Sequence, residues 1–389
     1  MSSARLYYLF MVLIHIGMGA TVTAYTPFLQ SIGLSLAEIG LVNTVFWTVL
    51  ILAELPTGML ADGRSRAWSM KLGGAFYSAG ALSYIFAGSF WSAAFAESLI
   101  GIGGAFISGA GTAWITDALQ REGRSKELRQ VYGTEALIKS VLMLIGGFLG
   151  AGIGLVNYRL IWVPFVVTGL AAAFVAHRHM NGKGEPLEYV SELEAFRLAW
   201  RQLRTSRALI WLIGALIVFG AVISFNHYWA IYFTEEVGQF NVAYVWVVAY
   251  LGLVSASQIV RKLTIPLGSE SRLIVLSVFI TGAGLGLTAI APALWFSIPA
   301  VVLHEFGRGL FQPLTDSFVQ HRVHSSYRAT FGSLQSFLGR MGFAIVPLIV
   351  WLTIQGRPDT QEPIMFVWSG CAIFLITGSL LLWITRPRT

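Results

Sequence analysis

Residues 208–233 read ALIWLIGALIVFGAVISFNHYWAIYF, a run of 26 residues without a single Asp, Glu, Lys or Arg. About 20 mostly apolar residues make a helix long enough to cross a bilayer. A helix also satisfies its backbone hydrogen bonds internally, as lipid requires, and the alternating polarity of barrel strands is missing here. Similar runs fill the chain in both directions and predict an all-α integral membrane protein with twelve transmembrane helices, at residues 5–29, 37–60, 67–88, 92–118, 131–155, 159–177, 208–233, 241–264, 272–291, 294–320, 329–353 and 363–385.

The composition supports a membrane protein. Charged residues make up 12% of the 389 residues and hydrophobic residues 56%, whereas soluble domains carry about 25% charged residues. We attribute the net charge of +7 to basic cytoplasmic loops and expect no nucleic-acid partner. The N-terminal apolar run, Leu6 to about Leu29, is too long for a signal-peptide core, so we interpret it as a retained first span. The single cysteine, Cys371, excludes an intrachain disulfide.

The basic residues predict the orientation of the chain. With the N-terminus in the cytoplasm, 21 of the 26 Lys and Arg residues fall on cytoplasmic segments. Arg159 and Arg357 fall in loops on the other side, and three basic residues fall within spans. This asymmetry follows the positive-inside rule and predicts that both termini are cytoplasmic. We expect a multi-pass protein of a cell membrane, the bacterial cytoplasmic membrane in particular.

Two parts of the chain resemble each other at a constant offset of 199 residues. Thr116-Asp117 corresponds to Thr315-Asp316, and the sequence RQVYGT at 129–134 corresponds to RATFGS at 328–333. The offset predicts a duplicated six-helix unit, because it is kept across a helix end, a loop and a helix start. Paired repeats of this kind place a substrate site between the halves near the bilayer midplane. The predicted domains are an N-terminal half, a cytoplasmic linker and a C-terminal half, at residues 1–178, 179–207 and 208–389.

The linker contains a predicted amphipathic helix at residues 186–207. Leu193, Phe196, Trp200 and Leu203 recur at helical spacing. Glutamates come early and arginines late, which suits the helix dipole. We expect this helix to lie on the inner membrane surface; the alternative is an ordinary solvated linker helix.

The loop after the second predicted span reads GMLADGRSR, residues 58–66. It resembles the signature loop of the major facilitator superfamily, which reads glycine, any residue, leucine, alanine, aspartate, arginine, any residue, glycine, arginine. The departures are Gly63, where the superfamily usually has arginine, and Ser65, where it has glycine. The resemblance extends over the whole chain and implies the superfamily's two six-helix halves. The lead-in ELPTG, residues 54–58, resembles a branch of bacterial drug and metabolite exporters.

The resemblance implies a conformational latch around this loop. Gly58 permits a close approach of two helices, and the Asp62 carboxylate would be stabilised at the N-terminus of the eleventh span. Arg66 and Asp117 would complete the charge cluster. In the superfamily the cluster holds the halves in the outward-open state, so we expect Gly58, Asp62, Arg66 and Asp117 to act in this way. The alternative is that they are solvated loop charges that fix the topology.

Two other segments depart from superfamily signatures. The fourth span has Glu97 four residues before Gly101, where the superfamily often has arginine, so the proton role of that arginine is not carried over. The fifth span has the glycine-rich run GGFLGAG at 146–152, which resembles that of antiporters but lacks their characteristic proline. Close helix packing explains these glycines equally well.

Charged residues inside the spans are the main candidates for function, because a charge at the bilayer centre costs about 2.5–3.5 kcal/mol. Arg340 lies about eleven residues, or about 16 Å, into the eleventh span. We expect it to face a central cavity and to contact an anionic substrate group or a proton-carrying carboxylate. Glu305 and Arg308 are spaced i, i+3, and Glu135 and Lys139 i, i+4, so each couple can pair. A buried structural ion pair is the alternative for each couple.

Histidines and tryptophans complete the candidate set. His15 and His227 can carry protons, although a membrane histidine is more often a hydrogen-bonded packing residue. Trp114 and Trp229 could line an amphiphilic pocket, although membrane tryptophans more commonly anchor at the interface. The full set of substrate and proton-coupling candidates is His15, Glu54, Trp114, Glu135, Lys139, Asn226, His227, Trp229, Glu305, Arg308, Gln335 and Arg340.

The sequence contains no metal-ligand spacing, phosphate loop or serine nucleophile elbow. We therefore expect a transporter and not an enzyme, with no cofactor and no metal. The favoured function is secondary active transport of a small organic molecule by alternating access, as proton-coupled efflux. Two alternatives stay open: uptake of a small metabolite, which the basic residues within the spans would suit if it is anionic, and lipid handling or membrane enzymology on the same architecture. The expected partners are the substrate, protons or another coupling ion in antiport or symport, and the bilayer, with the protein monomeric.

Overall fold

The computed structural model describes residues 1–63, 65–184, 192–262, 269–291, 293–320, 322–323 and 328–387. All regular secondary structure within these ranges is helical. The chain divides into two compact units. Unit 1 contains Met1–Tyr189 and Phe233–Ala243, and unit 2 contains Val190–Tyr232 and Tyr244–Thr389.

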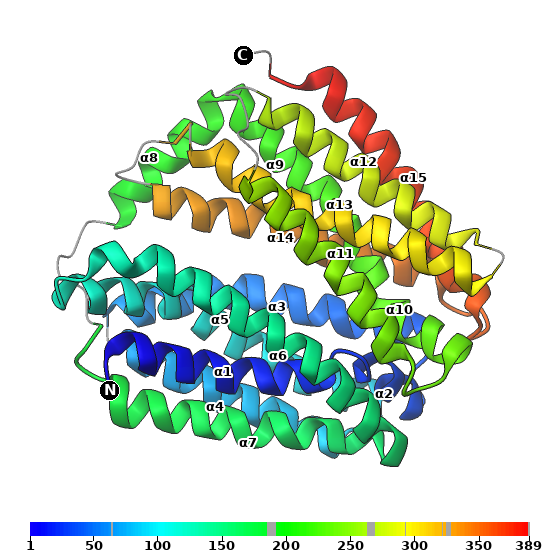
Figure 1. The fold of residues 1–389 in the computed structure, drawn as a ribbon, viewed down its shortest axis with the longest axis horizontal. Helices are drawn as coiled ribbons and strands as arrows, with labels where there is room; N and C mark the ends of the chain where they lie inside the picture. The colour runs from blue at the N-terminus through cyan, green and yellow to red at the C-terminus, as the bar shows by residue number, and fades with distance from the viewer. Residues whose placement is uncertain are drawn as a thin grey trace. The chain divides into compact units, whose positions relative to one another are not determined.

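Unit 1 is a bundle of long helices (Figure 1). Helix α4 packs against α5 and α7, α5 also packs against α3, and α1 packs against α6 and α7. A capping box of Ser89 and Ser92 begins α5, since the two hydroxyls satisfy backbone N–H groups that a helix start leaves free. The helices are α1 (Ser3–Thr21), α2 (Tyr25–Ser31), α3 (Leu36–Gly63), α4 (Arg66–Ile85), α5 (Phe90–Arg121), α6 (Leu128–Val156) and α7 (Trp162–Val175).

Unit 2 repeats these pairings. Helix α12 packs against α13 and α15, and α9 packs against α14 and α15. In the order of the sequence repeat these are the counterparts of α4 with α5 and α7, and of α1 with α6 and α7. The same neighbours in each unit are what a duplication would produce, which stays a prediction. The helices are α8 (Glu192–Thr205), α9 (Arg207–Phe219), α10 (Ile223–Val237), α11 (Val242–Lys262), α12 (Glu270–Ala289), α13 (Leu294–Gln320), α14 (Arg328–Ile354) and α15 (Gln361–Thr385).

Each predicted span corresponds to one helix, or to a helix broken at one point. The first span is broken between α1 and α2, at residues 22–24, and the seventh between α9 and α10, at the short 3-10 turn Gly220–Val222. The two breaks are almost one repeat offset apart. Within the described residues, ten helical segments are long and apolar enough to cross a membrane. Helices α4 and α13 are not among the ten, although they are 20 and 27 residues long.

Glycine pairs bring the first and fifth helices of each repeat into close contact. A Cβ on Gly146 of α6 would lie 2.5 Å from the Cα of Gly19 on α1. In unit 2, a Cβ on Gly220 would lie 2.7 Å from the Cα of Gly342 on α14. Real Cβ atoms do not fit in so little space. Both contacts therefore depend on glycine, as small residues commonly permit in membrane helix packing.

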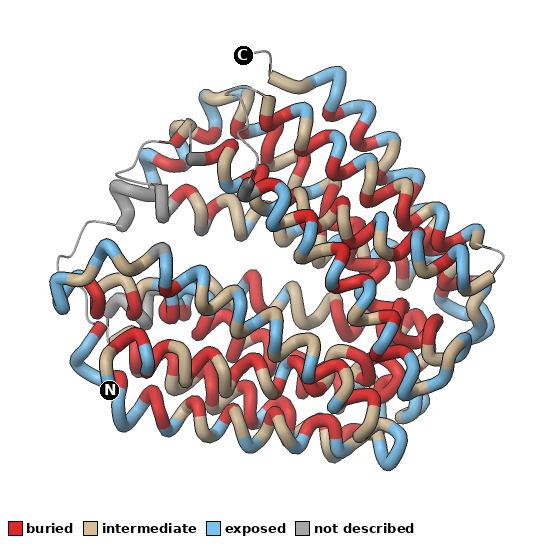
Figure 2. The backbone as a smooth tube through the Cα atoms, viewed as in Figure 1, coloured by how far each residue is buried: buried red, intermediate tan, exposed pale blue. Residues whose placement is uncertain are grey.

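The outer faces of the helices are apolar. On α7 the exposed side chains Val163, Val167, Leu170 and Phe174 are 41%, 60%, 57% and 62% accessible and recur at helical spacing. Figure 2 shows buried and exposed residues alternating along each helix in this way. An apolar stripe of this kind is stable against lipid chains and not against water.

The structure describes two of the four residues predicted for the apolar face of the linker helix α8, Trp200 and Leu203. Ala199 and Leu203 are buried, whereas Trp200 is 40% and Leu198 43% exposed. Gln202 holds the helix in unit 2, because its Nε2 donates a hydrogen bond to the Arg322 carbonyl over 2.9 Å. The side chains of Leu193 and Phe196 lie outside the described residues. A helix is present at Glu192–Thr205 within the predicted segment 186–207, and its place on the membrane surface stays a prediction.

The topology can be checked with reporter fusions. Fusions at Lys183 and after Thr389 are expected to report the cytoplasm, and a fusion near Thr360 the opposite side. An outside signal at the C-terminus would require an odd number of spans and would contradict the predicted orientation.

Candidate functional site

The strongest candidate site lies in unit 2, where one guanidinium joins two helices. Arg308 on α13 donates through Nη1 to Glu305 Oε1 over 2.6 Å and to Asn226 Oδ1 on α10 over 2.9 Å. The Glu305 side chain is 5% exposed and the Arg308 side chain 19%, and Asn226 is exposed. The predicted i, i+3 pair of Glu305 and Arg308 is therefore present, and Asn226, also predicted, is its third member.

Sequence analysis missed His304, which lies beside this ion pair. The ring is fully buried, and its Nδ1 lies 3.0 Å from the Thr281 carbonyl on α12. A carbonyl oxygen only accepts, so we assign the proton of the neutral ring to Nδ1. The lone pair is then on Nε2, which has no hydrogen-bond partner and lies 3.9 Å from Glu305 Oε1. Neighbouring residues of a helix do not usually face each other, which is why spacing did not indicate this contact.

A hydrogen bond between His304 and Glu305 depends on the protonation state of the two side chains. His304 Nε2 and an ionised Glu305 both only accept, so a hydrogen bond between them needs one added proton. While Arg308 holds Glu305, the carboxylate is neutralised without that proton. The site can therefore balance the Glu305 charge in two ways, with the guanidinium or with a proton.

The second predicted pair is not formed. Glu135 on α6 accepts a hydrogen bond from Tyr7 Oη on α1 over 2.8 Å. Lys139 is exposed and makes no ion pair with Glu135 in the described part of the chain. Tyr7 is fully buried in the packing between the two helices, so it reaches the carboxylate at a fixed position.

The remaining candidates of unit 1 each form a hydrogen bond within that unit. His15 Nδ1 lies 2.8 Å from the Met11 carbonyl of its own helix. Glu54 on α3 accepts from Ser108 Oγ on α5 over 3.3 Å. Trp114 is fully buried and donates through Nε1 to the Met180 carbonyl over 3.0 Å, which is a packing contact.

The aromatic and histidine candidates of unit 2 are more enclosed. Trp229 stacks on Trp246, with 5.5 Å between the ring centroids. His227 is 2% exposed, and neither ring nitrogen has a hydrogen-bond partner. Gln335 and Arg340 lie on α14 and are half-buried. The structure brings Asn226, Glu305 and Arg308 together, and the functional roles predicted for these three and for the other candidates stay predictions.

Two of the four predicted latch residues are in contact. Arg66 at the start of α4 forms an ion pair with Asp117 near the end of α5 and donates to the Ala113 carbonyl over 2.8 Å. Both side chains are only 14–15% exposed, so they are not freely solvated loop charges. The surroundings of Gly58 and the side chain of Asp62 lie outside what the structure describes.

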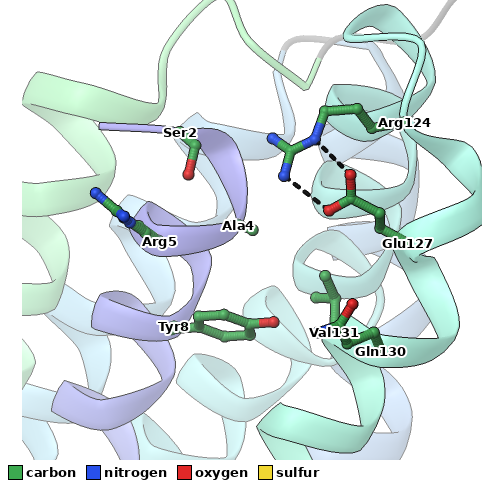
Figure 3. A pocket seen from close by; sticks show the side chains of 8 residues that line it. All are labelled: Ser2, Ala4, Arg5, Tyr8, Arg124, Glu127, Gln130 and Val131. Atoms are coloured by element: carbon green, nitrogen blue, oxygen red, sulfur yellow. Dashed lines mark hydrogen bonds and ion pairs between the residues drawn. The ribbon is translucent and has the colours of Figure 1, made fainter.

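A cavity of about 480 Å³ opens near the N-terminus of unit 1 (Figure 3). Arg124 and Glu127 form a bidentate ion pair at its rim, in which Nε donates to Oε1 over 2.8 Å and Nη2 donates to Oε2 over 2.7 Å. Beside it, hydrogen bonds from Ser3 lower the pKa of Glu122. The stabilisation from this bond is present above pH 4.5, the ordinary value, and is lost as the pH falls through the lowered pKa. None of the predicted substrate residues lines this cavity, whose walls are Ser2, Ala4, Arg5, Tyr8, Arg124, Glu127, Gln130 and Val131.

Comparison with known families decides what architecture this is. The family model described as Major Facilitator Superfamily matches residues 7–347. The chain belongs to the major facilitator superfamily. The resemblance inferred from residues 58–66 is therefore confirmed at the level of the superfamily, as is the all-α membrane fold. Membership also makes the chain a transport protein and not an enzyme.

Solved structures of the superfamily share this fold. A nucleoside transporter, NupG, matches with a TM-score of 0.78 and 13% identity over 100% of both chains. A point mutant of the same nucleoside transporter matches with a TM-score of 0.82 and 10% identity over 99% of this chain and 100% of that one. A bacterial homologue of the human lysosomal transporter Spinster, inward-facing and unoccupied, matches with a TM-score of 0.71 and 15% identity over 99% and 95%. A comparison with curated protein sequences gives no match.

Membership of the superfamily bears on the Glu305–Arg308 ion pair. Superfamily transporters bind small molecules within a lipid bilayer, often together with an ion. An ion pair buried in a helix bundle is costly unless it has a use or a partner. The Glu305–Arg308 pair has Asn226 as its partner, and Arg308 is still partly accessible.

Proposed function

We propose that the protein is a secondary active transporter that moves a small polar molecule together with protons by alternating access. The observation that supports this proposal is the shared guanidinium of Arg308, held by Glu305 and Asn226. Its substrate carries a carboxylate, phosphate or other strong acceptor that can take the place of Glu305 on Arg308.

Proton binding and substrate binding support each other in this site. A proton on Glu305 neutralises the carboxyl and releases Arg308 for the substrate. An ionised Glu305 left without Arg308 would be an unpaired buried charge, which costs several kcal/mol. His304 Nε2, 3.9 Å from Glu305 Oε1, is a position from which the proton arrives. Positive linkage of this kind leads to symport, the coupling that suits uptake.

Efflux by antiport is the second candidate, favoured by the exporter-like sequence ELPTG at residues 54–58. In antiport the proton and the substrate compete for the same group. A cationic substrate that binds ionised Glu305 would compete in this way. The sign of the linkage therefore distinguishes the two candidates.

A binding screen at two pH values tests the proposal. Purified protein is heated with nucleosides, organic anions and lipophilic cations at pH 6 and pH 8, and the shift in melting temperature is measured. Symport predicts that an acceptor-bearing compound binds more tightly at pH 6, by about 5- to 150-fold. A cation that binds more tightly at pH 8 would support antiport. Flux of the hit into liposomes under an imposed pH gradient then gives the direction.

We propose further that Gly58, Asp62, Arg66 and Asp117 form the conformational latch. The Arg66–Asp117 ion pair supports this proposal. The superfamily match, together with the repeated pairings, supports two six-helix halves at residues 1–178 and 208–389, joined by the linker 179–207. The protein is a monomer of a bacterial cytoplasmic membrane with cytoplasmic termini in this proposal.

Asp62→Asn tests the latch. The variant is expected to express and melt like the wild type but to transport more slowly, because the outward-open state loses a charge-assisted contact. Accessibility of single cysteines introduced on the two faces of the membrane should shift in opposite directions. Asp359→Asn, in the loop before α15, is the control and should leave both measurements unchanged. Unchanged flux and accessibility in Asp62→Asn would reduce Asp62 to a topology charge.

A further inference from the structure

Unit 1 contains a buried carboxylate that the proposed coupling site does not use. Glu97, the seventh residue after the start of α5, is 6% exposed. Its Oε2 accepts a hydrogen bond from the hydroxyl of Tyr84 on α4. The Tyr25 hydroxyl on α2 lies 3.4 Å from that of Tyr84 and close to the carboxylate. Two tyrosine hydroxyls thus lie beside the Glu97 carboxylate.

Aromatic rings close this site. Trp162 stacks on Tyr84 with 4.1 Å between the ring centroids and an interplanar angle of 8°. Phe28 contacts both rings edge-on, at 5.8 Å from Tyr84 and 5.7 Å from Trp162. Behind them α4 and α5 are in backbone contact, since a Cβ on Gly80 would lie 2.8 Å from the Ala96 carbonyl. The enclosure has no room for the hydration shell of an ionised carboxylate.

Glu97 has no cationic partner among the residues that the structure describes, where no Lys, Arg or His forms an ion pair with it. Arg159 reaches this end of α4, but its guanidinium donates to the Ile85 carbonyl over 2.6 Å. One turn from Glu97, the atoms of α3 nearest to a Cβ on Gly101 are the Phe46 carbonyl oxygen, the Leu50 backbone nitrogen and a methyl group of Val49.

These observations point to one protonation state. We propose that Glu97 is a proton-binding site, a neutral carboxylic acid while Tyr25, Tyr84 and Trp162 enclose it, which releases its proton when α2 moves away. A neutral carboxyl still accepts the Tyr84 hydrogen bond through its carbonyl oxygen, and its O–H can donate to a tyrosine oxygen. An ionised one would leave a buried charge without a counterion.

We assign the movement to α2, because a break in the helix precedes it. Helix α2 has seven residues and is separated from α1 by the break at residues 22–24. It carries both Tyr25 and Phe28, so a tilt of this short helix would open one side of the enclosure to water. The other side, where α4 meets α5, stays closed by backbone contact.

The two units build their buried carboxylates from equivalent elements. Glu97 lies among α2, α4 and α5, and the Glu305 site among α10, α12 and α13. In both units the segment after the break in the first helix of the repeat supplies a polar group, Tyr25 or Asn226. The difference is the counterion, because Arg308 neutralises Glu305 whereas a proton alone is left to neutralise Glu97.

Infrared spectroscopy tests this proposal without a substrate and independently of the proposed function. Spectra of the full-length protein in lipid are recorded at neutral pH and in the difference between neutral and alkaline pH. A carbonyl band of a protonated carboxylic acid is expected in the wild type and in Glu305→Gln, and its loss in Glu97→Gln. Melting temperature confirms that the variant is folded.

Tyr84→Phe is the second variant, and it keeps the carboxyl while removing its hydrogen-bond donor. Its carbonyl band is expected to persist at a higher frequency, because the carbonyl oxygen no longer accepts the tyrosine hydrogen bond. The proposal is overturned if a folded Glu97→Gln retains the full band, or if Tyr84→Phe leaves the band at its wild-type position.

Discussion

Glu305→Gln is expected to abolish accumulation of substrate against its gradient while leaving downhill counterflow at the wild-type level. Glutamine has the shape of the protonated carboxyl but cannot take up or release a proton. It also cannot hold Arg308 by charge, so the guanidinium is permanently available to an acceptor-bearing substrate. Binding should be as tight at pH 8 as at pH 6, with the pH dependence of about 5- to 150-fold lost.

Three further variants, assayed in the same way, distinguish a coupling residue from a substrate contact. Arg308→Gln should lose both uphill flux and counterflow, because it removes the substrate contact itself. Glu135→Gln tests the other predicted carboxylate, which accepts a hydrogen bond from Tyr7, in the same assays. Arg340→Gln tests the predicted midplane arginine in the same assays. Wild-type activity in Glu305→Gln and Arg308→Gln would show that their ion pair is structural, and His227 with the tryptophans would become the next candidate site.

Gly284→Ala is expected to destabilise the protein by about 1–3 kcal/mol, the usual range for a group inserted into a packed core. Gly284 lies on α12 against α13, and a Cβ there would be 2.7 Å from the Cα of His304 and 2.9 Å from the Ala300 carbonyl. The backbone has to move, and with it the His304 ring that Thr281 orients. We expect a lower melting temperature at a fixed scan rate and a weaker pH dependence of substrate binding.

Gly370→Ala is the matched control for this substitution. Gly370 lies inside α15 with nothing within 4 Å of the added Cβ, and alanine favours helix by about 0.8–1 kcal/mol over glycine. This variant should be at least as stable as the wild type. If Gly284→Ala has the same melting temperature as Gly370→Ala, α12 and α13 can separate at little cost. The contact between these helices then does not set the position of His304.

The sequence was a good guide to the helices and a partial guide to the site. The predicted spans agree with the observed helices to within a few residues, apart from the breaks at 22–24 and 220–222. Charge inside a span indicated Glu305 and Arg308, and their spacing of three residues predicted the ion pair. The same rule was wrong for Glu135 and Lys139, whose side chains form no ion pair in the described residues. The Glu135 carboxylate accepts instead from Tyr7, more than a hundred residues away in sequence, a contact that spacing does not indicate.

The sequence by itself determined that this chain is a helical membrane protein of the major facilitator superfamily. Long apolar runs can be stable only in lipid, and there only helices satisfy their backbone groups. Tertiary structure alone decided which polar groups meet. Asn226 reaches Arg308 across 82 residues, and Tyr84 and Tyr25 enclose Glu97 from two other helices. Such contacts depend on how the helices pack against each other, at glycines such as Gly80 and Gly284 where backbones touch. A hydrophobic run predicts a helix but does not determine which other helix it packs against.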